Sequence, residues 1–141
     1  MPFTNVFTPV RPSDEVRQFL LTLWQRRGEG VLLKRASVSI GTWKSQEHYC
    51  FDNVDTWVNH RPEHKRVDGF MMFNYLGWGL GFVRFTPHCV IEVEDHSLVD
   101  ITPHRASTDY PFIRHTGTMD KFIEILGEQG TNVGLDLIMP L

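Results

Sequence analysis

The chain has 141 residues, of which 41% are hydrophobic and 22% charged, and its formal net charge is −3. These values are typical of one globular domain that buries a core without disulfides. The acidic balance argues against a nucleic-acid partner or an anionic membrane surface, because both attract a basic face. No apolar run reaches the roughly 18 residues of a membrane helix, and the first residues do not resemble a signal peptide, so we expect a cytoplasmic protein.

The first predicted element is an amphipathic helix that begins after Pro12. Ser13 is the expected N-cap, and two acidic residues follow it at the positive end of the helix dipole. Apolar side chains then recur with helical spacing at Val16, Phe19, Leu20, Leu23 and Trp24. Gly28 is expected to end this helix, and residues 31–40 are expected to form a strand.

A second helix is expected over residues 45–60, stopped by Pro62. It begins either at Ser45 or just before Cys50. One face of this helix carries Cys50, Val54, Trp57 and Val58. That face is expected to pack against the rest of the domain.

Strand patterns dominate the second half of the chain. Strands are expected over residues 67–75, 80–85, 88–93, 97–102 and 135–139, with a short helix over 120–126. Helices therefore come first and a sheet follows. We predict a single α+β domain over residues 1–141, with N-terminal helices packed on an antiparallel sheet.

The turn at residues 94–96 sets the register of the hairpin around it. A three-residue loop places Val93 opposite Ser97 and gives His96 the left-handed conformation. In this register one face of the hairpin is entirely apolar: Cys89, Ile91, Val93, Val99 and Ile101. A two-residue loop would shift the pairing by one position and mix the faces, so the three-residue loop is favoured.

The same register brings an imidazole and a carboxylate together on the opposite face. His88 and Asp100 become diagonal neighbours, whose Cβ atoms lie roughly 7–8 Å apart or less. Cys50 lies in the first turns of the second helix, where the helix dipole favours a thiolate. A cysteine nucleophile needs a base beside it and a group that orients the base. We therefore predict a catalytic triad of Cys50, His88 and Asp100.

The order of Cys on a helix and then His and Asp on adjacent strands resembles the papain-like and transglutaminase-like superfamily, including arylamine acetyltransferases. The resemblance covers about residues 45–103 and rests on order and spacing. It implies a papain-like fold and a cysteine-dependent hydrolase or acyltransferase that needs no cofactor. In the papain branch a Gln before the Cys helps to form the oxyanion hole, which implies that role for Gln46. The backbone N–H of Cys50 is the alternative donor.

Three short segments are also similar to uncharacterised bacterial proteins. They read Cys50-Phe51-Asp52-Asn53-Val54, His88-Cys89-Val90 and Leu98-Val99-Asp100-Ile101-Thr102-Pro103. This likeness implies no particular substrate. We assign Asn53, Trp78 and His115 to substrate binding. The substrate itself, a small molecule or a peptide, and the oligomeric state stay open.

Two other interpretations fit the same residues. Cys50 could belong to the core, which would leave a binding or interaction module with a degenerate site on the same fold. A small metal-binding protein is the third possibility, with zinc bound by His48, Cys50, His88 and Cys89. Adjacent strand residues point to opposite faces, which argues against that set. A set of His88, Asp100 and His104 has no motif behind it.

Overall fold

The computed structural model describes residues 8–103, 110–129 and 134–139. The helices in these ranges are α2 (Asp14–Gln25), α3 (Cys50–His60), α4 (Met119–Gln129) and the 3₁₀ helices η1 (Arg27–Glu29) and η2 (Tyr75–Trp78). The strands are β1 (Lys34–Arg35), β2 (Ser39–Ile40), β3 (Trp43–Lys44), β4 (Lys65–Asn74), β5 (Phe82–Glu92), β6 (Leu98–Asp100), β7 (Phe112–Arg114) and β8 (Leu135–Ile138). The architecture is α+β, as the sequence predicts.

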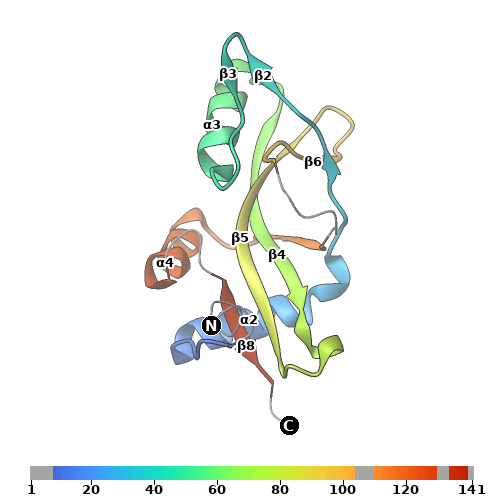
Figure 1. Cartoon of the computed structure of the whole chain (residues 1–141). Helices are drawn as coiled ribbons and strands as arrows, with labels where there is room; N and C mark the ends of the chain where they lie inside the picture. Colours follow the sequence, from blue (N-terminus) through green and yellow to red (C-terminus); the bar gives the residue numbers. More distant parts are fainter. Residues whose placement is uncertain (1–7, 104–109, 130–133, 140–141) are drawn as a thin grey trace.

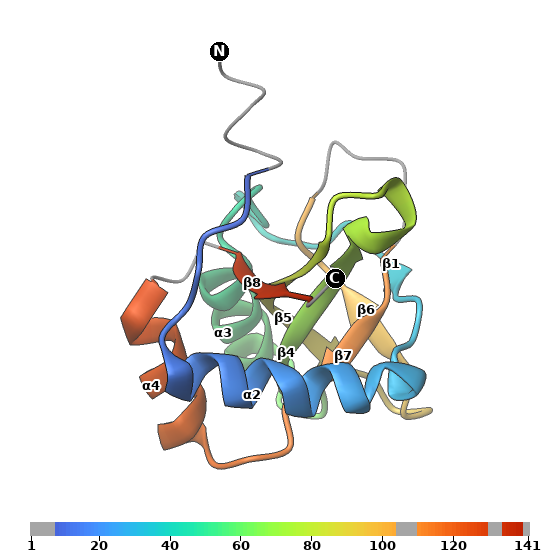
Figure 2. The same ribbon diagram turned by 90° about the horizontal axis from the view of Figure 1, so that it is seen from below.

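The long strands β4 and β5 form the centre of the sheet (Figure 1). The strand order is β1-β6-β5-β4-β7, and β8 pairs with the other end of β5. Helices α2 and α4 pack on one face of this sheet through a core that includes Leu20, Phe70 and Phe122. Helix α3 covers β5 farther along the same face, and Figure 2 shows α2 lying across the end of the strands.

The sheet is mixed, whereas the sequence pattern suggested an antiparallel one. Strand β1 runs parallel to β6, and the other paired strands described in this sheet are antiparallel. The segment predicted as one strand over 31–40 is divided: Val31 forms a bridge with Phe112, β1 joins the opposite edge, and β2 pairs with β3. This segment crosses from one edge of the sheet to the other, so it cannot stay in one ladder.

Strand β5 is continuous, although two separate strands over 80–85 and 88–93 were expected around Pro87. On its far side β8 pairs with residues 82–85 and β6 with residues 91–92. Between these segments no other described strand pairs with that edge of β5. Proline is tolerated in a strand where no neighbour needs its missing N–H, which explains why Pro87 does not end β5.

The hairpin has the register that was predicted from the apolar residues on one of its faces. The N–H of Val93 donates to the Ser97 carbonyl over 3.1 Å, and Ile91 pairs with Val99. His96 has φ of 69°, the left-handed conformation required by a three-residue loop. The predicted apolar face packs under α3 as one cluster of Cys89, Ile91, Val93, Val99 and Ile101.

The first two helices begin where the sequence allows. Ser13 caps α2 by accepting the Val16 N–H, and α3 begins at Cys50, the later of the two predicted starts. Gly28 lies within η1 and not at a left-handed helix end. In the described part of the chain, no helix is both long and apolar enough to cross a membrane.

Candidate active site

Cys50 is the first residue of α3 and points into the domain. Its exposed fraction is 7%, and its side chain packs with Val54 and Cys89. Tyr49 occupies the N-cap position and makes no side-chain capping hydrogen bond. The first backbone N–H groups of a helix have no partner within the helix. The thiol therefore belongs to the first residue of a helix. The side chain at the N-cap position does not bond to the backbone N–H groups there.

His88 and Asp100 are joined on adjacent strands of the sheet. His88 Nε2 lies 3.0 Å from Asp100 Oδ2, and the two residues are only 6% and 3% exposed. His88 lies in the stretch of β5 between β6 and β8, and Asp100 is the last residue of β6. Strand β4 pairs with His88 on one edge of β5, and on the other edge no described strand pairs with it.

The side chain of Cys50 also interacts with His88. Burial lowers the pKa of His88, but the interactions with Asp100 and Cys50 outweigh burial and raise the pKa to about 9. The imidazolium form is thereby favoured at neutral pH, directly beside the sulfur.

The carboxylate of Asp100 is held from two sides. Its Oδ2 faces His88, while its Oδ1 accepts the backbone N–H of Thr102 over 3.0 Å. A carboxylate fixed in this way can orient the imidazole ring and hold its tautomer. Asp100, His88 and Cys50 thus form a row, in which Asp100 is hydrogen-bonded to His88 and Cys50 raises the pKa of His88.

Gln46 and Asn53 interact with each other and not with a cavity. The side-chain oxygen of Asn53 accepts the Gln46 backbone N–H, and its amide nitrogen donates to the Gln46 carbonyl. The same amide nitrogen donates to Thr102 Oγ1 over 3.0 Å. Asn53 is 2% exposed, so these contacts take up the polar atoms of its side chain. Gln46 is exposed and lies just before the helix that carries the thiol.

Trp78 and His115 lie apart from the row. Trp78 is 67% exposed and belongs to η2, at the far end of the β4–β5 hairpin. That end is separated from His88 by at least the five residues after Val83, about 16 Å of strand. His115 Nε2 donates to the Thr118 carbonyl over 2.8 Å, and its ring packs on Phe122.

Two cavities open close to the row. One, of about 380 Å³, lies between the start of α3 and α4 and is lined in part by Tyr49, Phe51 and Met119. The other, of about 270 Å³, is lined by Asp100, Thr102, Pro103 and residues 35–37. Neither lining includes Cys50. The cavity at the start of α3 is the nearer of the two to Cys50 along the chain. The residues on either side of Cys50, Tyr49 and Phe51, both line it.

The proposed zinc ligands do not gather around one point. Cys89 is fully buried on the α3 face, and burial raises the pKa of its thiol. His88 instead contacts the Phe112 ring, which belongs to the core cluster on the other face. His48 is exposed, with its ring 3.5 Å from Glu47. His104 lies outside the described residues.

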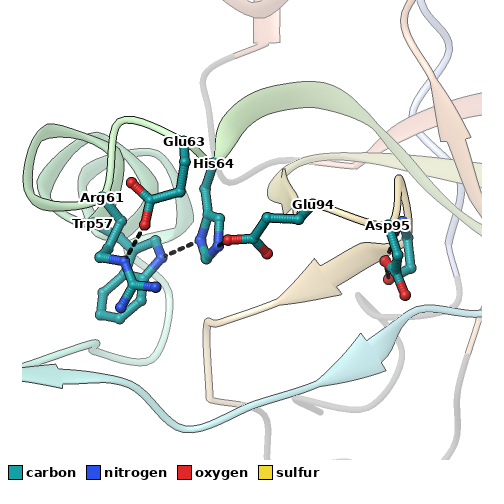
Figure 3. A network of polar contacts seen from close by, with 7 residues as sticks. Trp57, Arg61, Glu63, His64, Glu94 and Asp95 are labelled. Atoms are coloured by element: carbon teal, nitrogen blue, oxygen red, sulfur yellow. Dashed lines mark hydrogen bonds and ion pairs between the residues drawn. The ribbon is translucent and has the colours of Figure 1, made fainter.

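One group with metal-ligand spacing occurs within the described ranges: Glu63, His64 and Glu94 (Figure 3). His64 Nε2 lies 3.0 Å from Glu94 Oε1, and Trp57 Nε1 donates to His64 Nδ1 over 3.0 Å. An indole N–H can only donate, so His64 Nδ1 is an acceptor and Nε2 carries the proton. That tautomer leaves no Nε2 lone pair for a metal. Nothing in the sequence spacing pointed to this group.

Comparisons with family models, with curated proteins and with solved structures gave no match for this chain.

Proposed function

We propose that this protein is a cysteine-dependent hydrolase or acyltransferase, with Cys50 as nucleophile, His88 as acid and base, and Asp100 as the group that orients His88. The observation that carries the proposal is the position of His88, which is hydrogen-bonded to Asp100 and whose pKa is raised by both Asp100 and Cys50. We also propose that the fold is papain-like or transglutaminase-like, because a Cys at a helix start faces a His and an Asp on neighbouring strands.

The reaction would begin with transfer of the Cys50 thiol proton to His88. The thiolate attacks the carbonyl carbon of an amide or ester and forms a tetrahedral intermediate. The imidazolium then gives its proton to the leaving amine or alcohol as the carbon–heteroatom bond breaks. A thioester of Cys50 remains. Water or another nucleophile, deprotonated by His88, attacks this thioester and releases the thiol.

The developing oxyanion needs donors at the start of α3. The backbone N–H of Cys50 suits this role, because no side chain caps the helix. The exposed side chain of Gln46 is the second candidate donor, and Asn53 holds the backbone that carries it. An acyl group seated in the cavity beside Tyr49 and Phe51 would lie next to these donors.

The substrate class on this proposal is a small molecule or peptide with an acyl or amide carbonyl. We propose that the protein acts in the cytoplasm without a cofactor, and that neither nucleic acid nor a membrane is its partner. These statements rest on composition and charge, and on the chemistry of a thiol with its own base.

A binding module with a degenerate site is the second candidate. The 7% exposure of Cys50 favours it, because a nucleophile must be reached by a carbonyl carbon. On this alternative His88 and Asp100 would be a buried pair that stabilises the sheet edge, and the two cavities would bind a ligand without turnover.

One experiment separates the two candidates. The protein is incubated with p-nitrophenyl acetate, and the acylated residue is identified by mass spectrometry of peptides. A hydrolase or acyltransferase gives a burst of nitrophenol and an acetyl group on Cys50, and both are lost in Cys50→Ala. Acetylation confined to surface lysines, with no burst, would leave the binding module.

A further inference from the structure

We infer that Asn53 and Thr102 are positioning residues that join the thiol helix to the strand end carrying Asp100. The inference rests on the proposed function, since it concerns the geometry of the same site. Neither residue faces a reacting atom, so both would act through the row of Cys50, His88 and Asp100.

The amide of Asn53 ties three parts of the chain together. It accepts from the Gln46 N–H at 3.0 Å and donates to the Gln46 carbonyl at 2.8 Å. It also donates to Thr102 Oγ1 at 3.0 Å. One buried side chain therefore fixes the segment before the nucleophile and reaches across to the end of β6.

Thr102 continues the connection with a different group. Its hydroxyl accepts from Asn53, while its backbone N–H donates to Asp100 Oδ1 at 3.0 Å. Thr102 is 5% exposed, so water cannot readily replace the hydroxyl contact. The carboxylate that orients His88 is thereby connected to α3.

These contacts complete a closed ring. Cys50 and Asn53 are three residues apart on α3, a spacing that places them on one face of the helix. Asp100 and Thr102 are two residues apart, the spacing of one face of an extended chain. The ring of contacts runs through hydrogen bonds from His88 to Asp100, Thr102 and Asn53, and returns through the first turn of α3 to Cys50, whose side chain acts on His88. The position of the sulfur relative to the imidazole is therefore tied to the contacts of Asn53 and Thr102.

Loss of the Thr102 hydroxyl is expected to break this ring of contacts at Asn53, while Cys50, His88 and Asp100 stay unchanged. Thr102→Val keeps the backbone N–H to Asp100 and removes the acceptor for Asn53, while Thr102→Ser keeps both. Asn53→Asp replaces the amide donor by a carboxylate that repels the Gln46 carbonyl, while the Thr102 hydroxyl must turn from acceptor to donor. In both variants the connection between α3 and β6 is weakened, so Cys50 can shift relative to His88.

The test measures the rate of Cys50 alkylation by iodoacetamide from pH 5 to 9 in the full chain. Thr102→Val and Asn53→Asp should slow the reaction at pH 6 by about five- to tenfold, the loss expected for one hydrogen bond. They should also move the midpoint of the pH profile upward. Thr102→Ser should stay within about twofold of the wild type.

A matched control separates positioning from simple loss of stability. Thr118 Oγ1 accepts the Lys121 N–H at the start of α4, so Thr118→Val also deletes one hydroxyl contact at a helix start, here an exposed one. It should lower the melting temperature and leave the pH profile of Cys50 unchanged. If Thr102→Val and Asn53→Asp behave like this control, the two residues are structural only and the inference is overturned. If Thr102→Val does not fold, Asn53→Asp and Asn53→Ser decide on the same criterion.

A second measurement keeps this inference distinct from the proposed function. The imidazole of His88 is titrated by NMR in protein with isotope-labelled histidine, a readout that needs no reaction of the thiol. Its midpoint, about 9 in the wild type, should fall in Thr102→Val and hold in Thr102→Ser. A wild type without fast alkylation below pH 7 would end the proposed function, whereas an unchanged His88 midpoint in Thr102→Val would end the ring.

Discussion

Two of the histidine–carboxylate pairs in the described residues have the same separation. His88 Nε2 is 3.0 Å from Asp100, and His64 Nε2 is 3.0 Å from Glu94. The first pair is buried at the edge of β5, and the second connects the start of β4 to the β5–β6 loop. By the distance alone, neither pair is a better candidate for catalysis than the other.

The difference lies in the second partner of each ring. His88 interacts with the thiol of Cys50, which can give up a proton, while His64 accepts from the indole N–H of Trp57, which cannot (Figure 3). The first ring can therefore move between neutral and protonated forms during a reaction. The second is held as one tautomer. A carboxylate beside a histidine is common, and the partner on the other nitrogen decides what the pair can do.

The largest expected effect is on the reactivity of Cys50 when each histidine is removed in turn. His88→Gln should slow alkylation at pH 6 by roughly 100-fold, because it removes the base that takes the thiol proton and the positive charge that favours a thiolate. His64→Gln should have no effect on this rate. Site-resolved mass spectrometry after iodoacetamide labelling measures it, with the buried Cys89 as an unreactive internal reference. Equal alkylation rates in His88→Gln and His64→Gln would mean that the two histidines do not differ in their effect on Cys50.

The next effect concerns stability against pH. The folded pKa of His88 is raised to about 9 from an ordinary 6.5, so its stabilisation is fully present below pH 6.5. It is lost as pH rises through 9. The free energy of unfolding should fall by up to about 3 kcal/mol between these values. Urea unfolding at a series of pH values measures the decline, which should disappear in His88→Gln and persist in His64→Gln. A flat profile in the wild type would contradict the buried ion pair.

A smaller effect is expected when each carboxylate is replaced by its amide. Asp100→Asn keeps the shape and the hydrogen-bonding reach, but it removes the charge that raises the pKa of His88. The alkylation rate of Cys50 at pH 6 should fall by about tenfold. Glu94→Gln is the matched control on the same hairpin and should leave the rate unchanged. A larger loss in Glu94→Gln than in Asp100→Asn would reverse the assignment of the two pairs.

Much of the site can be predicted from local periodicity. The sorting of Cys89, Ile91 and Val99 onto one face permits a single register, and that register alone places His88 beside Asp100. Pro62 and the amphipathic pattern indicate the helix that Cys50 begins. Each of these steps uses residues close together in the sequence, where the repeat of a helix or strand fixes geometry.

The contacts between distant segments could not be predicted in this way. Asn53 meets Thr102 across 49 residues, and His64 meets Glu94 across 30. Such contacts depend on how α3 packs on the sheet. The hydrophobic periodicity of each element, taken separately, does not determine that packing. Spacing offered one usable signal that went unrecognised: Asn53 follows Cys50 by three residues on a helix, and Thr102 follows Asp100 by two.

The smallest expected effect comes from the residue that holds the second pair. Trp57→Phe removes the N–H that donates to His64 Nδ1 and keeps most of the ring packing, so the free energy of unfolding should fall by about 1 kcal/mol. Cys50 should react as in the wild type. The variant also frees His64 to carry its proton on Nδ1, which exposes the Nε2 lone pair between Glu63 and Glu94. Calorimetric titration with Zn²⁺ should therefore show tighter binding in Trp57→Phe than in the wild type. Binding of equal strength in both proteins would mean that the indole does not fix the tautomer, and the contrast between the two histidines would then rest on burial alone.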